Sequence, residues 1–350
     1  MQSLMKPGSI VVVGGGNDIR KPGGKVVQNL AEHGFAKLWV VNPKSDRVQG
    51  LPTFATIAEL PAPPELAILA VPAPQVPGAV QALIDRGTRA FIVLSAGFSE
   101  TDAAGRELEQ QLIERIERAG ALLVGPNSLG VFTPAYFGVF GGPDLHPAPG
   151  TIDLLSASGS TAAFIMEAGL DRGLRFASTV SVGNSACLGV EDFLGVLDED
   201  PGPSPARTCL LYLESIEEPH RILEHARSLH AKGRRVVALK AGTTEVGARA
   251  ASSHTGAMAT SDAAVGALFD KAGIVRVSSK SEMVDVAGVL TWSRPPTSDD
   301  IVIITQAGGP GILLADELSS HGFRVPELPA ELQRVLLAGQ IDAAINSGNS

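Results

Sequence analysis

Two residues of this sequence have the types and settings that nucleophilic chemistry needs. His254 stands in a run of small residues, Ala250–Ala257 (AASSHTGA), which has none of the bulky apolar neighbours of a core histidine. Glu214 ends the apolar run CLLYLE, where a strand would reach the carboxyl edge of a sheet. A carboxylate can hold the Nδ1–H of an imidazole and leave Nε2 as the nucleophile. We therefore predict a histidine–carboxylate pair; an ordinary loop histidine and a surface glutamate remain the alternatives.

Two further turns could hold the group that such a pair would attack. The segment Ser156–Thr161 (SASGST) places hydroxyl residues and a glycine before a predicted helix, where free N–H groups and the helix dipole favour an anion. Asn127, in the turn GPNS, follows another predicted strand and could orient an acyl or amide group. An ordinary helix N-cap and a plain Pro-Asn turn are the alternative interpretations.

A third glycine-containing turn lies near the N-terminus. Gly14-Gly15-Gly16 follows an apolar run and precedes a helical pattern, so its backbone N–H groups could approach a phosphate. The next strand end has Lys44, with Arg47 nearby, where a site for NAD would have an acidic residue. A cation there suits a phosphorylated ribose, as in coenzyme A or NADP. The alternative interpretations are a turn that binds no ligand and a lysine that is simply solvated.

The elements that would position these residues alternate along the chain. Short runs apolar on both faces indicate buried parallel strands, here Ile10–Val13, Leu38–Val41, Leu66–Val71, Phe91–Leu94, Leu122–Val124, Ile152–Leu155, Thr179–Val182, Cys209–Leu213, Val236–Lys240 and Ile274–Val277. Helical patterns lie between them, at about 101–119, 160–169, 218–231 and 262–272. For the first helix we expect Thr101 as N-cap and Gly120 as C-terminal stop. The alternation predicts an α/β fold with doubly wound sheets.

The chain is predicted to contain three units. A Pro/Gly-rich stretch at 141–150 is typical of a linker, and the strand–helix pattern restarts after it and again after Arg294-Pro295-Pro296. We place the domains at 1–146, 147–294 and 295–350. The last, which opens with an expected strand at Ile301–Thr305, is too short for a complete doubly wound domain.

The composition and charge of the sequence exclude several classes of protein. With 28 Lys and Arg against 37 Asp and Glu, the net charge is −9, and no basic cluster indicates nucleic-acid binding. No apolar run is long enough to span a membrane, and the N-terminus lacks a signal-peptide pattern, so we expect a cytoplasmic protein. The 2 cysteines make no disulfide framework or metal site. His220, His225 and His230 point in different directions on a helix and are expected to be solvent-exposed.

Taken in order, these motifs resemble those of the NDP-forming acyl-CoA synthetases, the superfamily of succinyl-CoA synthetase and ADP-forming acetyl-CoA synthetase. The resemblance runs from about residue 7 to at least 325, through GGGNDIRKPGGK at 14–25, VVNPK at 40–44, LAVPAP at 69–74, SAGFSE at 95–100, GPNSLG at 125–130, SASGS at 156–160, SVGNSA at 181–186, LYLES at 211–215 and KAG…RAASSHTGAMA at 240–259. It implies a Rossmann-like CoA-binding domain, a flavodoxin-like succinyl-CoA synthetase-like domain and the start of another flavodoxin-like domain.

The resemblance also implies residue roles. By this resemblance, His254 is the histidine that is transiently phosphorylated, and Glu214 is the carboxylate that holds this histidine in place. Asn127 matches the asparagine near the thioester. Phosphate binding is assigned to the turn containing Ser156, Ser158, Gly159 and Ser160. The residues implied around coenzyme A are Gly14, Gly15, Gly16, Lys21, Lys44, Val71, Pro72, Ser95, Ala96 and Gly97. No metal ligand is expected on this chain.

The implied activity interconverts acyl-CoA, ADP and phosphate with a carboxylic acid, coenzyme A and ATP. Mg-ADP or Mg-ATP would bind ATP-grasp domains that this sequence lacks, supplied in the same polypeptide or by a partner subunit of an oligomer. Two other classes stay open. One is a non-catalytic CoA-sensing or scaffold module, as in some protein acetyltransferases, and the other is an NADP-dependent oxidoreductase.

Overall fold

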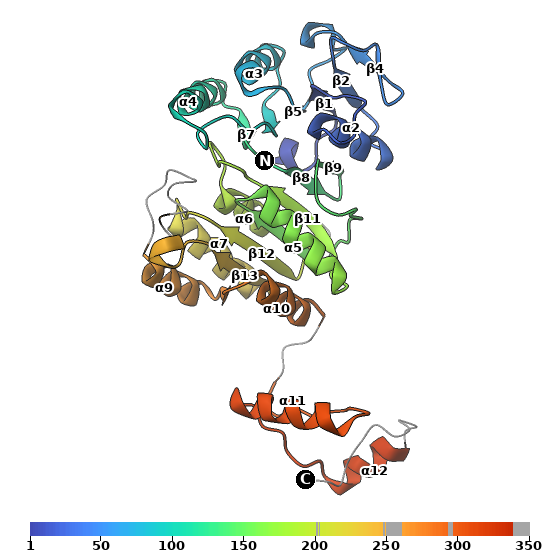
Figure 1. Ribbon diagram of the computed structural model, residues 1–350, viewed down its shortest axis with the longest axis vertical. Helices are drawn as coiled ribbons and strands as arrows, with labels where there is room; N and C mark the ends of the chain where they lie inside the picture. Colours follow the sequence, from blue (N-terminus) through green and yellow to red (C-terminus); the bar gives the residue numbers. More distant parts are fainter. Residues whose placement is uncertain (201, 203, 248, 250–260, 293–296, 339–350) are drawn as a thin grey trace. The chain divides into compact units, whose positions relative to one another are not determined.

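The computed structural model describes residues 1–200, 202, 204–247, 249, 261–292 and 297–338. They form two compact units, Met1–Ser293 and Arg294–Ser350. The larger unit contains two sheets with helices on both faces of each (Figure 1). The predicted α/β fold is therefore confirmed. Among the described residues no helix has both the length and the apolar character that crossing a membrane requires.

The first sheet holds the Gly14 turn at its centre. Its order is β3-β4-β2-β1-β5-β6-β7, with all neighbours parallel except β3 and β4. The strands are β1 (Ile10–Val13), β2 (Leu38–Val41), β3 (Arg47–Val48), β4 (Leu51–Phe54), β5 (Leu66–Leu69), β6 (Ala90–Val93) and β7 (Leu122–Val124). The helical segments are α1 (Gln2–Met5), α2 (Pro22–Glu32), η1 (Ile57–Glu59), η2 (Ala73–Gln75), α3 (Val76–Asp85) and α4 (Ala103–Arg118).

Side chains from opposite pleats of these strands build two cores. In β1, Ile10 and Val12 pack with Leu30 of α2, whereas Val11 packs with Val80 of α3 and the apolar side chains of α4. The fully buried strand sequence IVVV is thus explained by helices on both faces.

The second sheet has the order β14-β13-β12-β10-β11-β8-β9. Its strands are β8 (Gly130–Thr133), β9 (Tyr136–Val139), β10 (Ile152–Ser156), β11 (Phe176–Ser181), β12 (Thr208–Leu213), β13 (Arg235–Lys240) and β14 (Val275–Val277). Strands β10 to β14 run parallel; β8 pairs antiparallel with β11, and β9 pairs antiparallel with β8 to form a hairpin. Helices α5 (Gly159–Asp171) and α10 (Lys280–Trp292) cover one face, and α6 (Val190–Glu199), α7 (Pro219–Ala231) and α9 (Asp262–Ala272) cover the other (Figure 1).

The hairpin β8–β9 links the two halves of the larger unit. It follows the last strand of the first sheet in sequence but pairs with the second sheet. Helix α2 of the first half packs on it, and the Asn29 side chain donates a hydrogen bond of 2.7 Å to the Val139 carbonyl. One continuous core includes side chains of both sheets, for example Ile92 and Val180.

Three local expectations from the sequence are wrong. Asp102, not Thr101, caps α4, because its carboxylate accepts a hydrogen bond of 2.8 Å from the Gly105 N–H. His225 is buried, since α7 packs against α6 and brings Nδ1 to 3.1 Å from Asp198.

The third wrong expectation concerns the smaller unit. Residues 301–305 form no strand; next to them Asp300 makes only an isolated bridge with Arg324. The smaller unit otherwise contains α11 (Gly308–Ser320) and α12 (Ala330–Ala338).

Candidate functional site

The carboxyl edge of the first sheet gathers the residues expected around coenzyme A. Strands β2, β1, β5, β6 and β7 are neighbours in register, so the loops that follow them emerge side by side. These loops carry Gly14, Gly15, Gly16, Lys44, Val71, Pro72, Ser95, Ala96, Gly97 and Asn127. Ligands of open α/β sheets bind at this edge. The Ser95 hydroxyl ties two of the loops together by donating to the Val71 carbonyl at 2.5 Å.

The glycine turn has the shape of a phosphate cradle. Gly14 has φ +86°, and a Cβ there would lie 2.6 Å from the Ala70 carbonyl oxygen. A Cβ at Gly23, in the first turn of α2, would lie 2.3 Å from the Gly14 carbonyl. Gly16 differs, because a Cβ there would meet nothing within 4 Å. The turn is therefore packed on the protein side and open at Gly16, which fits a ligand phosphate at a helix N-terminus. Lys21 and Lys44 are exposed cations on the flanking segments.

The carboxyl edge of the second sheet forms the serine turn before α5. Ser158 is the N-cap, and its hydroxyl accepts a hydrogen bond of 3.3 Å from the Thr161 N–H and lies 3.2 Å from the Ser160 hydroxyl. Ser156 is fully buried, and its hydroxyl donates to the Ser158 carbonyl at 2.7 Å, so it shapes the turn from behind. The N–H groups of Gly159 and Ser160 are at the open first turn of the helix, where an anion is favoured.

The two carboxyl edges face each other across a tight backbone junction. The Asn184 N–H donates to the Pro126 carbonyl at 2.9 Å, and the Gly125 N–H donates to the Val182 carbonyl at 3.2 Å. Gly183 is required here, because its φ is +58° and a Cβ would lie 2.2 Å from the Pro126 oxygen. The junction therefore fixes the two halves of the site against each other.

Polar side chains extend this junction. Asn127 has φ +57°, and its amide nitrogen donates to Asn184 Oδ1 at 3.4 Å. The Asn184 amide nitrogen lies 2.6 Å from Glu100 and 2.8 Å from Glu109. Burial opposes ionisation of Glu100, but hydrogen bonds from Asn184 and from the Gly97 N–H outweigh it and lower the pKa of that carboxyl. This network holds the Asn127 amide toward the pocket.

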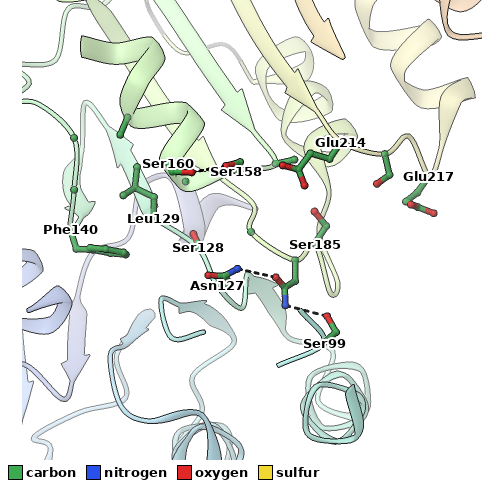
Figure 2. A pocket seen from close by; sticks show the side chains of 18 residues that line it. Ser99, Asn127, Ser128, Leu129, Phe140, Ser158, Ser160, Ser185, Glu214 and Glu217 are labelled. Carbon is green, nitrogen blue, oxygen red and sulfur yellow. Dashed lines mark hydrogen bonds between the residues drawn. The ribbon is translucent and has the colours of Figure 1, made fainter. Parts of the chain in front are cut away.

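A pocket of about 460 Å³ lies between the two edges. Figure 2 shows Leu129 and Phe140 on one side of it, the serines of the α5 turn above, and Asn127, Ser185, Glu214 and Glu217 on the other sides. Its remaining lining residues are Ser99, Ser128, Gly141, Gly142, Ala157, Gly159, Ala163, Gly183, Asn184 and Ser215. The pocket therefore brings together Asn127, Ser158, Gly159, Ser160 and Glu214 from the residues predicted by sequence.

Glu214 is positioned by the end of β12. Its backbone carbonyl accepts a hydrogen bond of 2.9 Å from the buried Lys240 ammonium, and its carboxylate is hydrogen-bonded to the Tyr212 hydroxyl. Burial raises the pKa of Tyr212, and the Glu214 charge adds to this shift, so the phenol remains a donor. Burial lowers the pKa of Lys240. His254 lies outside the described residues. Among the residues that are described, no cluster of His, Cys, Asp and Glu could hold a metal ion.

Sequence reasoning missed several residues of the pocket. Phe140 directly precedes the stretch interpreted as a linker, Gly142 lies within that stretch, and Asn184 lies within the SVGNSA segment, for which the sequence indicates no role. Ser128 is buried and donates to the Ser181 carbonyl at 2.6 Å, so it joins the two halves. Gly125, Asn127 and Gly183 have positive φ values, which Gly and Asn adopt most readily, so the GPN and GN sequences indicate turns at these positions but not that the turns meet.

The fold and this site define a two-sheet α/β protein whose ligand site lies at the carboxyl edges of its parallel strands. Family models for a CoA binding domain and for a succinyl-CoA ligase like flavodoxin domain match residues 8–134 and 149–290 respectively. The ADP-forming acetate–CoA ligase I of Archaeoglobus fulgidus is 34% identical over 96% of this chain and 48% of its own length. Subunit alpha of the ADP-forming acetate–CoA ligase I of Pyrococcus furiosus is 31% identical over 95% of this chain and 72% of its own length.

The structure agrees with these matches. Acetyl-coenzyme A synthetase 1 of Ca. Korarchaeum cryptofilum, solved in complex with phosphate and ADP, superposes with a TM-score of 0.86 at 30% identity, over 96% of this chain and 72% of that one. The chain belongs to the NDP-forming acyl-CoA synthetase family and corresponds to its CoA-binding, alpha-subunit-like region. It spans about half the length of the Archaeoglobus relative.

Proposed function

We propose that this chain is the CoA-binding and phosphohistidine part of an ADP-forming ligase that interconverts acyl-CoA, ADP and phosphate with a carboxylic acid, coenzyme A and ATP. Acetate is the acid named for the Archaeoglobus and Pyrococcus relatives. The observation that supports the proposal is the pocket in which an amide (Asn127), a helix N-terminus (Ser158–Ser160) and a carboxylate (Glu214) converge from three strand ends.

The first step would take place where the two sheet edges meet. A phosphate oxygen attacks the thioester carbonyl, the C–S bond breaks, and the sulfur leaves as the thiol of coenzyme A after gaining a proton. The Asn127 amide would donate to the carbonyl oxygen as negative charge develops on it. The Gly159 and Ser160 N–H groups would hold the phosphate. The product is an acyl phosphate.

The second step would transfer the phosphoryl group to His254. Nε2 attacks phosphorus, the P–O bond to the acyl group breaks, and the carboxylate leaves. Glu214 would accept the Nδ1–H hydrogen bond and stabilise the charge formed on the ring. An oxygen of the ADP β-phosphate then attacks phosphorus, the N–P bond breaks, and ATP forms. Such transfers depend mainly on positioning and charge stabilisation.

ADP, the final acceptor of the phosphoryl group, would bind to a region other than these 350 residues. We propose an ATP-grasp region that carries Mg-ADP, in the same polypeptide or in a partner subunit of an oligomeric cytoplasmic enzyme. The domain limits that accompany this proposal are 1–146 for coenzyme A, 147–294 for the phosphohistidine loop and 295–350 for the beginning of a third domain.

The test is ATP synthesis from acyl-CoA, ADP and phosphate by the chain supplied with an ATP-grasp region, fused or separate. Replacing Glu214 by Gln should lower the rate about 10- to 100-fold, the order of the loss that follows removal of the partner that orients a metal-bound imidazole. Glu224→Gln, at an exposed position of α7, is the control and should not change it. Coenzyme A binding without any ATP formation would instead identify a CoA-sensing module and overturn the catalytic proposal.

A further inference from the structure

One side of the pocket is a wall of apolar side chains. Leu129 precedes β8 and Phe140 follows β9, and the Phe140 N–H donates to the Leu129 carbonyl at 3.2 Å, which fixes the two residues beside each other. Leu129 is 6% exposed, and Phe140 is half-buried against both cores. Ala163 of α5 completes the wall. A wall held by backbone hydrogen bonds and core packing is preformed for a ligand.

The residues beside this wall have little or no side chain. Gly141 and Gly142 follow Phe140, and Gly159 and Ala163 lie on the facing turns of α5. A Cβ at Gly142 would lie 3.0 Å from the Met166 Cε, and a Cβ at Gly159 would lie 2.9 Å from the Leu129 Cβ, so these two glycines allow the backbone to pack closely beside the wall. Because none of these four residues has a side chain longer than a methyl, none of them fills the pocket. The pocket volume, about 460 Å³, is in the range that encloses much larger ligands than acetate.

The charge of the pocket also limits the charge that a group bound beside the wall can carry. Within the described residues its lining includes the carboxylates Glu214 and Glu217 but no Lys or Arg. A second carboxylate on the substrate would therefore lose its hydration near like charges and gain no cation, which is costly in a partly buried site. The polar groups, Asn127 and the serine turn, are needed by the reacting carboxyl and phosphate.

We propose that the acid used by this site is a monocarboxylic acid with an uncharged apolar tail of several carbons, which packs on Phe140 and Leu129, and that Phe140 and Ala163 determine its size. This inference rests on the proposed function, because it assigns the pocket to the acyl group. Acetate would bind but would leave the apolar wall uncovered. Succinate-like acids would be rejected.

The experiment is calorimetric titration of the chain with coenzyme A, acetyl-CoA, isovaleryl-CoA, phenylacetyl-CoA and succinyl-CoA, without phosphate or ADP so that no thioester is consumed. Isovaleryl- or phenylacetyl-CoA should bind at least ~10-fold more tightly than acetyl-CoA, since each added carbon in an apolar pocket contributes a factor of this order. Succinyl-CoA should bind more weakly than acetyl-CoA.

Two variants test the residues named. Ala163→Leu should remove the preference for the larger tails, so that they bind no more tightly than acetyl-CoA, and Phe140→Ala should lower the ratio of their affinity to that of acetyl-CoA. Phe164→Ala is the matched control, because this phenylalanine is 55% exposed on the same helix and does not line the pocket. If Ala163→Leu does not fold, Ala163→Val serves with a smaller expected effect.

The outcomes separate the two proposals. Equal affinities for acetyl-CoA and the larger thioesters, with coenzyme A bound, overturn the inference alone. Tight succinyl-CoA binding also overturns it. Absence of binding by coenzyme A itself overturns the proposed function and the inference with it.

Discussion

The backbone junction between the two sheet edges predicts that Gly183→Ala is unusually destabilising. Gly183 is in the left-handed region at φ +58°, and a Cβ would approach the Pro126 carbonyl oxygen to 2.2 Å and the Asn127 carbonyl carbon to 2.8 Å. Both neighbours are backbone atoms, so a side-chain rotation cannot relieve the contact. The same movement would break the hydrogen bond from the Asn184 N–H to Pro126.

The expected cost has two parts. A left-handed conformation for a residue with a Cβ costs about 1–2 kcal/mol. Forcing an extra carbon into a packed junction costs about 1–3 kcal/mol more. We therefore expect Gly183→Ala to lower the free energy of unfolding of the larger unit by about 2–5 kcal/mol.

A second glycine separates these two parts. Gly233, between α7 and β13, has φ +79°, but a Cβ there would meet nothing within 4 Å. Gly233→Ala should therefore cost only the conformational part, about 1–2 kcal/mol. Urea unfolding followed by circular dichroism measures both variants. A Gly183→Ala variant no less stable than Gly233→Ala would show that the two edges are not in rigid contact at this point.

Three other predictions concern the same region. Gly16→Ala should leave stability within about 0.5 kcal/mol, because its surroundings are open, while calorimetric titration shows at least fivefold weaker coenzyme A binding; unchanged affinity would argue against the cradle. Ser128→Ala should cost about 1–3 kcal/mol in urea unfolding, because it leaves the buried Ser181 carbonyl and Gly130 N–H without their partner; a cost below ~0.5 kcal/mol would contradict this. Burial, with the charges of Asp192, Glu218 and Glu217, raises the pKa of Glu191 in the folded state, so its contribution to stability is present at low pH and lost as pH rises through that pKa. Glu191→Gln should therefore increase the free energy of unfolding at pH 8 and not at pH 4. Glu199→Gln, at an exposed position of the same helix, is the control and should show no such pH-dependent gain. A gain from Glu191→Gln that is independent of pH would contradict the raised pKa of Glu191.

The general fold could be predicted because strands such as Ile10–Val13 are apolar on both faces and each is followed by a short turn, which in several cases contains glycine. Those turns are local in sequence, so the candidate residues at Gly14, Asn127, Ser158 and Glu214 could be named before their positions were known. The meeting of the two edges could not be foreseen in the same way. It depends on contacts between distant segments, such as Pro126 with Asn184, and on a hairpin that leaves the first sheet to pair with β11.

The apolar wall escaped prediction for a related reason. Phe140 stands next to a Pro/Gly-rich stretch that is typical of a linker, and nothing nearby indicates that Leu129 and α5 lie beside it. His225 was misjudged because helical spacing shows which residues share a face but not which face packs on α6. The expected strand at 301–305 has the right composition, but the only bridge described beside it is the isolated Asp300–Arg324 pair. A strand needs a continuous ladder with a neighbour.

The proposed function requires that this chain carry a phosphohistidine at position 254. The direct measurement is incubation with γ-labelled ATP, Mg²⁺ and an ATP-grasp region, followed by separation of the chain and treatment with acid or alkali. We expect acid-labile, alkali-stable label on the wild-type chain and on His220→Ala, whose histidine is exposed on α7, and none on His254→Ala. Label of the same kind and amount on His254→Ala would contradict it.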